Sequence, residues 1–254
     1  MRIIIITQDE PFYLGKNINY LLNILPKEHQ VVGAVIANPS PFGKKESFVK
    51  KARKTLSIFG IKFFIFYSIK YIMNYFDTEK NVQSIFSKHG IPKIKLTKSI
   101  NHQSSIKAIE MYSPDLLVSI QGNEIFKKSI IKLAKKGCIN LHTALLPKYR
   151  GLMPTFWALK NNEKYTGVSV FFVDEGIDSG PIIFQKRIEI KNQTQEELII
   201  QTKKIGMEAI VEAIKLINED NITLIENDDS KKTYFSFPNK SDVNDFKKIG
   251  KSFF

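Results

Sequence analysis

Apolar runs and amphipathic segments alternate from the first residues of the chain. Residues 2–7 form an apolar, mostly β-branched run, which is typical of a strand buried on both faces of a parallel sheet. Residues 16–25 repeat apolar side chains at helical spacing, and residues 31–37 form a second apolar run. This order of strand, helix and strand predicts an α/β fold with a doubly wound, mostly parallel sheet.

The same patterns continue through the second half of the chain. Further strands are predicted over 116–120, 138–141, 166–173 and 181–190. Shorter elements are predicted as helices over 82–89, 104–112, 125–135 and 153–159, and as marginal strands over 91–96 and 221–225. A long amphipathic helix over 194–217 starts at Thr194, with Glu197 three positions on, and this pair predicts a capping box.

One stretch does not fit this alternation. Residues 56–76 are almost wholly apolar and aromatic, and they follow a basic run over 39–54 that is typical of a solvated helix face. Lys62, Lys70 and Asn74 interrupt the stretch, which argues against a helix that crosses a membrane. We expect an apolar helical insertion that packs against the domain or a homodimer partner, with contact to a membrane surface as the alternative.

Length and charge narrow the possible classes. The 254 residues allow one large domain, predicted over 1–217, with a short C-terminal extension over 218–254. The net charge of +13 comes mostly from lysine, because only four of the 38 basic residues are arginine, and nucleic acid is not the expected partner. No signal-peptide pattern follows Met1, so we expect a cytoplasmic location or the periphery of the membrane. Cys138 is the single cysteine and is interpreted as a small apolar residue of the sheet.

The most informative polar residues belong to the predicted strand 138–141 and its end. Strand side chains alternate between faces, so Asn140 and His142 point one way while Ile139 and Leu141 bury on the other side. The two polar residues therefore lie at the carboxyl end of a strand, where open α/β sheets bind their ligands.

A carboxylate follows strand 166–173, where Asp178 stands between Gly176 and Gly180. Each feature alone is commonly structural, because a strand histidine often bonds a carbonyl and an Asp between glycines often serves a turn. Together, however, the three side chains suit acyl transfer. Histidine moves protons near neutral pH, aspartate orients the imidazole, and asparagine donates to an oxyanion. The combination favours an enzyme.

The pattern Asn-x-His-x-x-Leu-Leu-Pro-x-x-Arg-Gly, followed by Gly-x-Asp-x-Gly, resembles the formyltransferases that use 10-formyltetrahydrofolate. That family includes methionyl-tRNA, glycinamide ribonucleotide and nucleotide-sugar formyltransferases, and the resemblance is clear over about 114–190. It implies a Rossmann-like fold with Asn140, His142 and Asp178 as the catalytic residues. The sequence departs from the pattern at Ala144, where the family usually has serine, and this puts one substrate contact in doubt.

The resemblance also implies a site for the co-substrate 10-formyltetrahydrofolate, without a metal. The predicted contacts are Ile120, Gln121 and Gly122, then Leu145, Leu146 and Pro147, and finally Val173, Asp174, Glu175, Gly176 and Gly180. In the implied reaction an amine attacks the formyl carbon, Asn140 and protonated His142 stabilise the oxyanion, and Asp178 polarises His142.

The formyl acceptor is not determined by these motifs. A tRNA is expected to need a further binding domain, and glycinamide ribonucleotide a glycine-rich phosphate loop, which residues 8–15 lack. We therefore expect a small-molecule amine, specifically a nucleotide-linked amino sugar. The alternatives are activity like that of methionyl-tRNA formyltransferase, hydrolysis of 10-formyltetrahydrofolate, and a folate- or membrane-surface-binding protein without catalysis.

Overall fold

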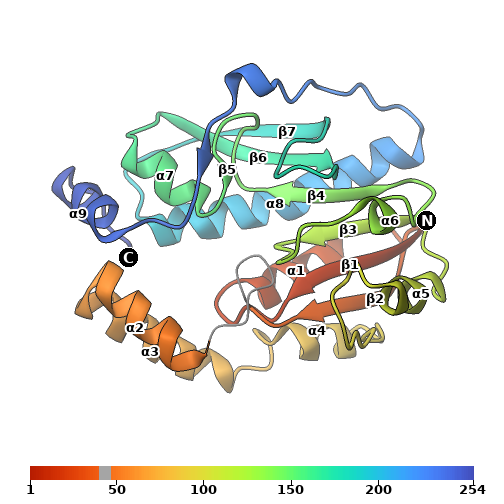
Figure 1. The fold of residues 1–254 in the computed structure, drawn as a ribbon, viewed down its shortest axis with the longest axis horizontal. Helices are drawn as coiled ribbons and strands as arrows, with labels where there is room; N and C mark the ends of the chain where they lie inside the picture. Colours follow the sequence, from red (N-terminus) through yellow and green to blue (C-terminus); the bar gives the residue numbers. More distant parts are fainter. Residues whose placement is uncertain (40–46) are drawn as a thin grey trace.

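A six-stranded sheet with the order β2-β1-β3-β4-β6-β7 forms the centre of the molecule (Figure 1). The computed structural model describes residues 1–39 and 47–254, with the backbone alone at Phe48. The strands of this sheet are β1 Arg2–Gln8, β2 Gln30–Ala37, β3 Leu116–Ile120, β4 Cys138–His142, β6 Tyr165–Phe172 and β7 Ile182–Glu189. Two short strands, β5 Arg150–Gly151 and β8 Tyr234–Phe235, pair separately in parallel.

The direction of the strands changes across the sheet. Strands β2, β1, β3 and β4 run parallel, whereas β6 is antiparallel to both β4 and β7. The predicted α/β fold with a mostly parallel, doubly wound sheet is therefore confirmed. The reversal at β6 was not predicted, and it decides how the loop after that strand reaches the site.

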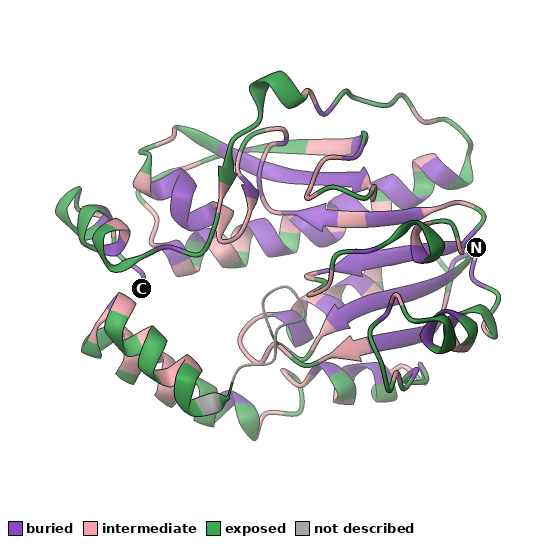
Figure 2. Ribbon diagram, in the orientation of Figure 1, coloured by how far each residue is buried: buried purple, intermediate pink, exposed green. Residues whose placement is uncertain are grey.

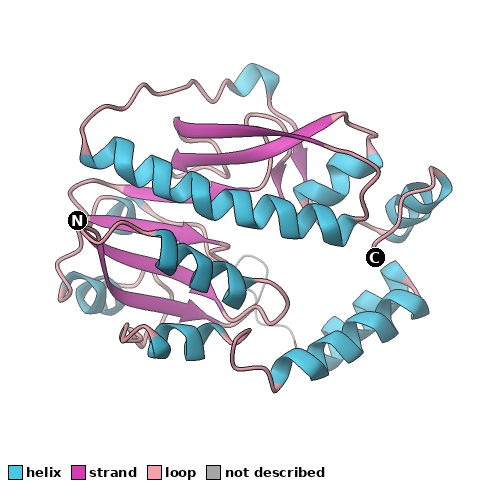
Figure 3. Ribbon diagram, turned by 180° about the vertical axis from the view of Figure 1, so that it is seen from behind, coloured by secondary structure: helices cyan, strands magenta, loops and turns pink. Residues whose placement is uncertain are grey.

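Helices cover both faces of the sheet. They are α1 Leu14–Ile24, α2 Phe48–Phe59, α3 Ile61–Tyr75, α4 Val82–Lys88, α5 Gln103–Glu110, α6 Lys128–Ile131, α7 Pro154–Lys160, α8 Gln195–Asn218 and α9 Lys240–Lys248. Apolar residues of α1, α4 and α8 pack on one face of the sheet, and those of α5 and α6 pack on the other. Figure 3 shows α1 and α8 lying across the first face, and Figure 2 shows the buried strands between the two layers.

Several local predictions are confirmed. Helix α8 begins after Thr194 with the predicted capping box, in which the Thr194 hydroxyl accepts from Glu197 N and the Glu197 carboxylate accepts from Thr194 N. Cys138 is a buried free thiol on β4, and burial raises its pKa, as expected for an apolar packing residue.

Three of the shorter elements extend over fewer residues in the structure than the sequence predicted. The helix expected over 125–135 is only α6, because the Asn101 amide bonds Ile125 O and Lys127 N and holds that backbone extended. The strands expected over 91–96 and 221–225 are single bridges, Ala34–Lys93 and Ile182–Ile225. Pro92, which lacks an amide hydrogen, contributes only its carbonyl to the first bridge.

The apolar stretch 56–76 was expected to form one helical insertion. In the structure it forms the end of α2 followed by α3. Gly60 separates them with φ of 88°, a conformation that glycine adopts at little cost. Residues 40–46 of the basic run lie outside the described residues, and residues 48–54 of that run belong to α2. No helix in the described part of the chain has the length and apolar character to cross a membrane.

The C-terminal segment runs back over the sheet and packs against it. Strand β8 pairs with β5, and α9 contacts both α2 and α7. One aromatic cluster joins these elements; its buried members include Phe59, Phe156, Trp157, Phe246 and Phe253. The division at residue 217 remains a prediction, but residues 218–254 share a hydrophobic core with the domain before them.

Candidate active site

Strand β4 presents Asn140 and His142 on the face predicted from its alternation. Ile139 and Leu141 point the other way, into the core beneath α8. On the neighbouring strand β6, Phe171 lies opposite Asn140 and Ser169 lies opposite His142. Within residues 1–39 and 47–254 no protein group bonds the Asn140 side-chain amide, so this donor is left for a ligand.

The His142 ring is held between two oxygen acceptors. Its Nε2 lies 2.7 Å from the Tyr149 carbonyl oxygen, so Nε2 carries a hydrogen and donates it. Its Nδ1 lies 3.6 Å from Asp178 Oδ2, and the two side chains are only 8% and 14% exposed. A protonated His142 thus has an acceptor facing each ring nitrogen, and the ring orientation is fixed in both protonation states.

The residue that provides the first acceptor is itself fixed. The Tyr149 hydroxyl donates to Glu163 Oε1 at 2.7 Å, and its ring stacks on Phe235 with centroids 5.3 Å apart. Burial, and then the bond to Glu163, raises the pKa of Tyr149 to about 12. The ring stacking and the bond to Glu163 hold Tyr149, and with it the backbone carbonyl that faces His142.

Asp178 reaches His142 by a route that the sequence did not indicate. We expected His142 and Asp178 to meet because both follow the carboxyl ends of strands. That reason is wrong, because β6 is antiparallel to β4 and its carboxyl end, Phe172, pairs with Ile139 near the start of β4. The loop after β6 folds back along the sheet instead, and Asp178 Oδ2 accepts a hydrogen bond of 2.9 Å from Gly151 N.

A buried polar network from the C-terminal segment holds the two loops together. Asn227 Nδ2 donates to the carbonyls of Asp178 and Gly180, both at 2.9 Å. Asn227 Oδ1 accepts from Arg150 at 2.8 Å, and Asp229 accepts from the other end of the same guanidinium at 2.7 Å. Sequence reasoning missed Asn227, since it lies 77 residues from Arg150 and belongs to no recognisable motif.

The loop after β4 is anchored by two polar side chains that were also not predicted. Ser169 Oγ donates to Ala144 O at 2.6 Å and accepts from Leu146 N at 3.1 Å. Gln185 Nε2 donates to Leu146 O at 2.8 Å. Ala144 and Leu146 are buried, whereas Leu145 and Pro147 are partly exposed. A serine hydroxyl at position 144 would therefore lie in a packed interior.

The loop after β3 holds an unusual polar atom. Ile120 is buried and its carbonyl accepts from Thr7 Oγ1 at 2.9 Å. Gln121 follows with φ of 56°, and Gly122 lies against Ser119. The buried Gln121 Oε1 has no hydrogen-bond partner in the described part of the chain. A buried amide oxygen without a donor indicates a missing partner, such as a ligand N–H group.

The predicted contacts over residues 173–180 divide into anchors and exposed positions. Val173 N donates to Cys138 O, and Asp174 Oδ1 accepts from Gly176 N and from Ser179 Oγ. A side chain at Gly180 would put its Cβ 1.8 Å from Phe172 O, so only glycine fits. Glu175 and Gly176 are exposed. The Asp174 carboxylate is thus bonded within its own loop.

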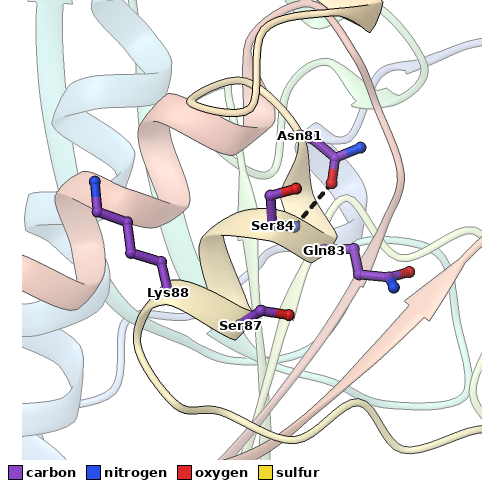
Figure 4. Close-up of a pocket in the computed structure, with 5 residues that line it drawn as sticks. All are labelled: Asn81, Gln83, Ser84, Ser87 and Lys88. Atoms are coloured by element: carbon purple, nitrogen blue, oxygen red, sulfur yellow. Dashed lines mark hydrogen bonds between the residues drawn. The ribbon is translucent and has the colours of Figure 1, made fainter.

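Other places in the described structure are weaker candidates for a functional site. Across residues 1–39 and 47–254, no group of three His, Cys, Asp or Glu side chains is placed to hold a metal ion. A hollow on the outer side of α4 is lined by Asn81, Gln83, Ser84, Ser87 and Lys88 (Figure 4). The Asn81 side chain accepts from Ser84 N at 2.8 Å and so caps α4. None of these residues belongs to the predicted site.

More than half of the chain matches one known protein family. Residues 71–214, more than half of the chain and including β4, β6 and their loops, match the family described as formyl transferase. The chain belongs to the formyl transferase family.

Methionyl-tRNA formyltransferases from two organisms are similar to this chain in sequence. The methionyl-tRNA formyltransferase of Kosmotoga olearia is 36% identical over 163 residues, which cover 64% of this chain and 52% of that protein. That of Thermotoga maritima is 32% identical over 173 residues, which cover 67% of this chain and 55% of that protein. The chain spans about half the length of the curated relatives it matches.

Solved formyl transferases share the fold over most of this chain. An N-formyltransferase from Helicobacter canadensis, solved with folinic acid and dTDP-3-aminofucose, has a TM-score of 0.57 and 18% identity. The alignment covers 93% of this chain and 71% of that one. A phosphoribosylglycinamide formyltransferase from Anaplasma phagocytophilum has a TM-score of 0.62 and 17% identity, with coverage of 94% and 99%.

Proposed function

We propose that this protein transfers a formyl group from 10-formyltetrahydrofolate to an amine. The observation that carries the proposal is the arrangement of Asn140, His142 and Asp178 on one face of the sheet. The Asn140 amide has no protein partner among the described residues, and His142 Nδ1 lies 3.6 Å from Asp178 Oδ2. Membership in the formyl transferase family supports the same chemistry.

In the proposed reaction the acceptor nitrogen bonds to the formyl carbon, and the bond from that carbon to the donor's nitrogen breaks. The formyl oxygen carries negative charge between these two events. Asn140 donates to that oxygen through its side-chain N–H, and loss of one such donor typically lowers kcat by about 10²–10³-fold. The protonated ring of His142 adds positive charge beside it.

The proton released by the amine is taken up by the nitrogen that leaves. We assign its transfer to Asp178 through a water molecule, since Asp178 Oδ1 makes no hydrogen bond within the described residues while Oδ2 is held by Gly151. His142 keeps Asp178 in place and stabilises its negative charge. The Asn227 network positions both loops without touching the reacting atoms.

The residues predicted for the co-substrate fit a pterin ring. Such a ring carries several N–H donors on one edge, and Gln121 Oε1 is an acceptor for which the described part of the chain provides no donor. The partly exposed Leu145 and Pro147 offer apolar surface to a ligand, and the exposed Gly176 gives a backbone that a ligand can approach. Asp174 serves the shape of its loop instead of binding the ligand directly.

For the acceptor we propose a nucleotide-linked amino sugar. The protein's net charge of +13 attracts a diphosphate, and the fold is shared with an enzyme solved with such a sugar nucleotide. A second candidate acceptor is methionyl-tRNA, which is favoured by 36% identity to a methionyl-tRNA formyltransferase. Hydrolysis, with water in place of the amine, needs the same three residues.

The test is a competition among acceptors. The protein is incubated with 10-formyltetrahydrofolate and, separately, with nucleotide-linked amino sugars, charged methionyl-tRNA, glycinamide ribonucleotide or no acceptor, and mass spectrometry records the formylated product. We expect a formylated sugar nucleotide. Formylation of the tRNA alone would overturn the acceptor but keep the chemistry, and donor consumption without any acceptor would indicate a hydrolase. No consumption of the donor under any condition would leave a binding protein.

A further inference from the structure

Helix α3 exposes an unbroken apolar stripe along its outer side. The side chains of this stripe, 51% to 79% exposed, are Ile61, Ile65, Ile69, Ile72 and Phe76. Their spacing of four, four, three and four positions places them on one face of the helix. Contiguous exposed apolar surface of this kind marks an interaction site.

The opposite face of α3 attaches the helix firmly to the rest of the protein. The Phe63 ring stacks on the Phe59 ring with their centroids 4.3 Å apart. The Tyr67 hydroxyl oxygen lies 3.1 Å from the Tyr13 hydroxyl oxygen, and the Asn74 side-chain amide donates to Pro11 O at 2.9 Å. Lys70 pairs with Glu196 at the start of α8. These contacts fix the rotation of α3 about its axis, so the stripe is held outward.

Charge indicates what covers the stripe. Residues 47–76 contain six basic side chains and no acidic one. Arg53 and Lys62 are exposed, and Lys62 lies beside the stripe, one position after Ile61. Apolar side chains bordered by basic ones are typical of helices that lie in the surface of an anionic membrane.

We propose that α2 and α3 form a docking surface for an anionic lipid bilayer, with the α3 stripe inserted at the level of the headgroups. A second copy of the chain fits less well, because pairing two stripes would bring together two segments that contain no acidic residue and that each hold five basic residues besides Lys70, which pairs with Glu196. The helix lies on the membrane and does not cross it: its 15 residues span about 22 Å, less than the roughly 30 Å of a bilayer core.

The position of the pair in the fold is consistent with a membrane on one side of the molecule. Figure 1 shows α2 and α3 beyond the carboxyl ends of β1 and β2 and away from the β6–β7 hairpin, and Lys70 of α3 pairs with Glu196 at the start of α8. Figure 2 shows exposed and intermediate residues along the whole pair. A flat surface resting on α3 would thus leave the sheet itself uncovered.

Vesicle co-sedimentation tests the proposal. The purified protein is mixed with vesicles of phosphatidylcholine alone or of an equimolar mixture with phosphatidylglycerol, at increasing sodium chloride. We expect binding to the mixed vesicles, weaker binding as salt rises, and little binding to phosphatidylcholine alone. The double variant Ile65→Ser/Ile72→Ser should bind at least about tenfold more weakly, and Lys62→Gln about fivefold.

A matched control separates the stripe from general surface hydrophobicity. The double variant Ile200→Ser/Leu224→Ser removes two apolar side chains that are 51% and 50% exposed outside α3, and its vesicle binding should equal that of the wild type. Equal binding by the Ile65→Ser/Ile72→Ser variant, or no binding by the wild type, would overturn the proposal. A lipid-independent dimer in light scattering that this variant makes monomeric would assign the stripe to a second copy and overturn it as well.

Discussion

The loops around His142 and the α2–α3 pair are both attached to the same sheet, but by different forces. The loops are held by directional bonds: Tyr149 O and Asp178 face the imidazole, and Asn227 links the loops through three hydrogen bonds. The α2–α3 pair is held largely by aromatic rings packed on one side, while the other side carries exposed apolar residues. The first arrangement fixes single atoms, whereas the second fixes a surface.

This difference predicts which property, turnover or stability, each kind of substitution should change. Hydrogen bonds between buried groups lose their whole value when one partner is removed, because the other is left unsatisfied. Ring packing instead loses energy in proportion to the volume removed. Substitutions in the site should therefore change turnover more than stability, and those in the aromatic cluster should change stability first.

The largest expected effect belongs to the aromatic cluster. Phe59 is 3% exposed and contacts Phe63, Phe237 and Phe253, so Phe59→Ala should lower the free energy of unfolding by about 3–5 kcal/mol. The matched variant Ile61→Ala lies two positions away and removes a side chain that is 58% exposed. It should change the free energy of unfolding by less than about 0.5 kcal/mol. Urea denaturation measures both values. Equal costs would mean that the two sides of the α2–α3 pair do not differ as described.

The next effect is on catalysis. Asp178→Asn should lower kcat for formyl transfer by at least about 10²-fold, because the variant loses the charge that faces His142 and the base that moves the proton. Asparagine tolerates the φ of 50° at this position and still accepts from Gly151 N, so the fold should persist. Steady-state kinetics and a thermal melt measure the two outcomes.

The control for this prediction lies in the same loop. Asp174→Asn removes a carboxylate whose Oδ1 is bonded to Gly176 N and Ser179 Oγ, and an amide oxygen can accept the same bonds. We expect less than about a tenfold loss of kcat, since no charge near the reacting atoms is removed. If Asp174→Asn proved as damaging as Asp178→Asn, the roles assigned to the two carboxylates would be mistaken.

A smaller effect should follow from the network that sequence reasoning missed. Asn227→Ala leaves the carbonyls of Asp178 and Gly180 without their Asn227 donor and removes one of the acceptors of the Arg150 guanidinium, at a cost of about 1–3 kcal/mol in unfolding free energy. Both loops lose their link, so kcat should fall by about tenfold. The exposed neighbour Asn221 provides the comparison, since Asn221→Ala should alter neither quantity. Unchanged kinetics in the Asn227 variant would restrict the network to stability.

The sequence predicted what depends on neighbouring residues and missed what depends on distant ones. Alternation along 138–141 placed Asn140 and His142 on one face, and the capping signal placed the start of α8, because both patterns act within a few residues. The reversed direction of β6 and the link from Asn227 to Arg150 depend on pairings between segments far apart in the chain. No periodicity records such pairings, so the sequence did not indicate the route by which Asp178 comes within 3.6 Å of His142.

The smallest expected effect lies outside both regions and sets the baseline for the others. Thr194→Ala removes the side-chain half of the capping box at the start of α8 and should cost about 1 kcal/mol in unfolding free energy. The site lies on other elements, so kcat should stay at the wild-type value. Thr194→Ser keeps an oxygen that can accept from Glu197 N and should restore most of the stability. A drop in kcat with Thr194→Ala would mean that a change at the start of α8 alters the site on β4. The losses of kcat in the Asp178 and Asn227 variants would then have to be compared with the loss in Thr194→Ala and not with zero.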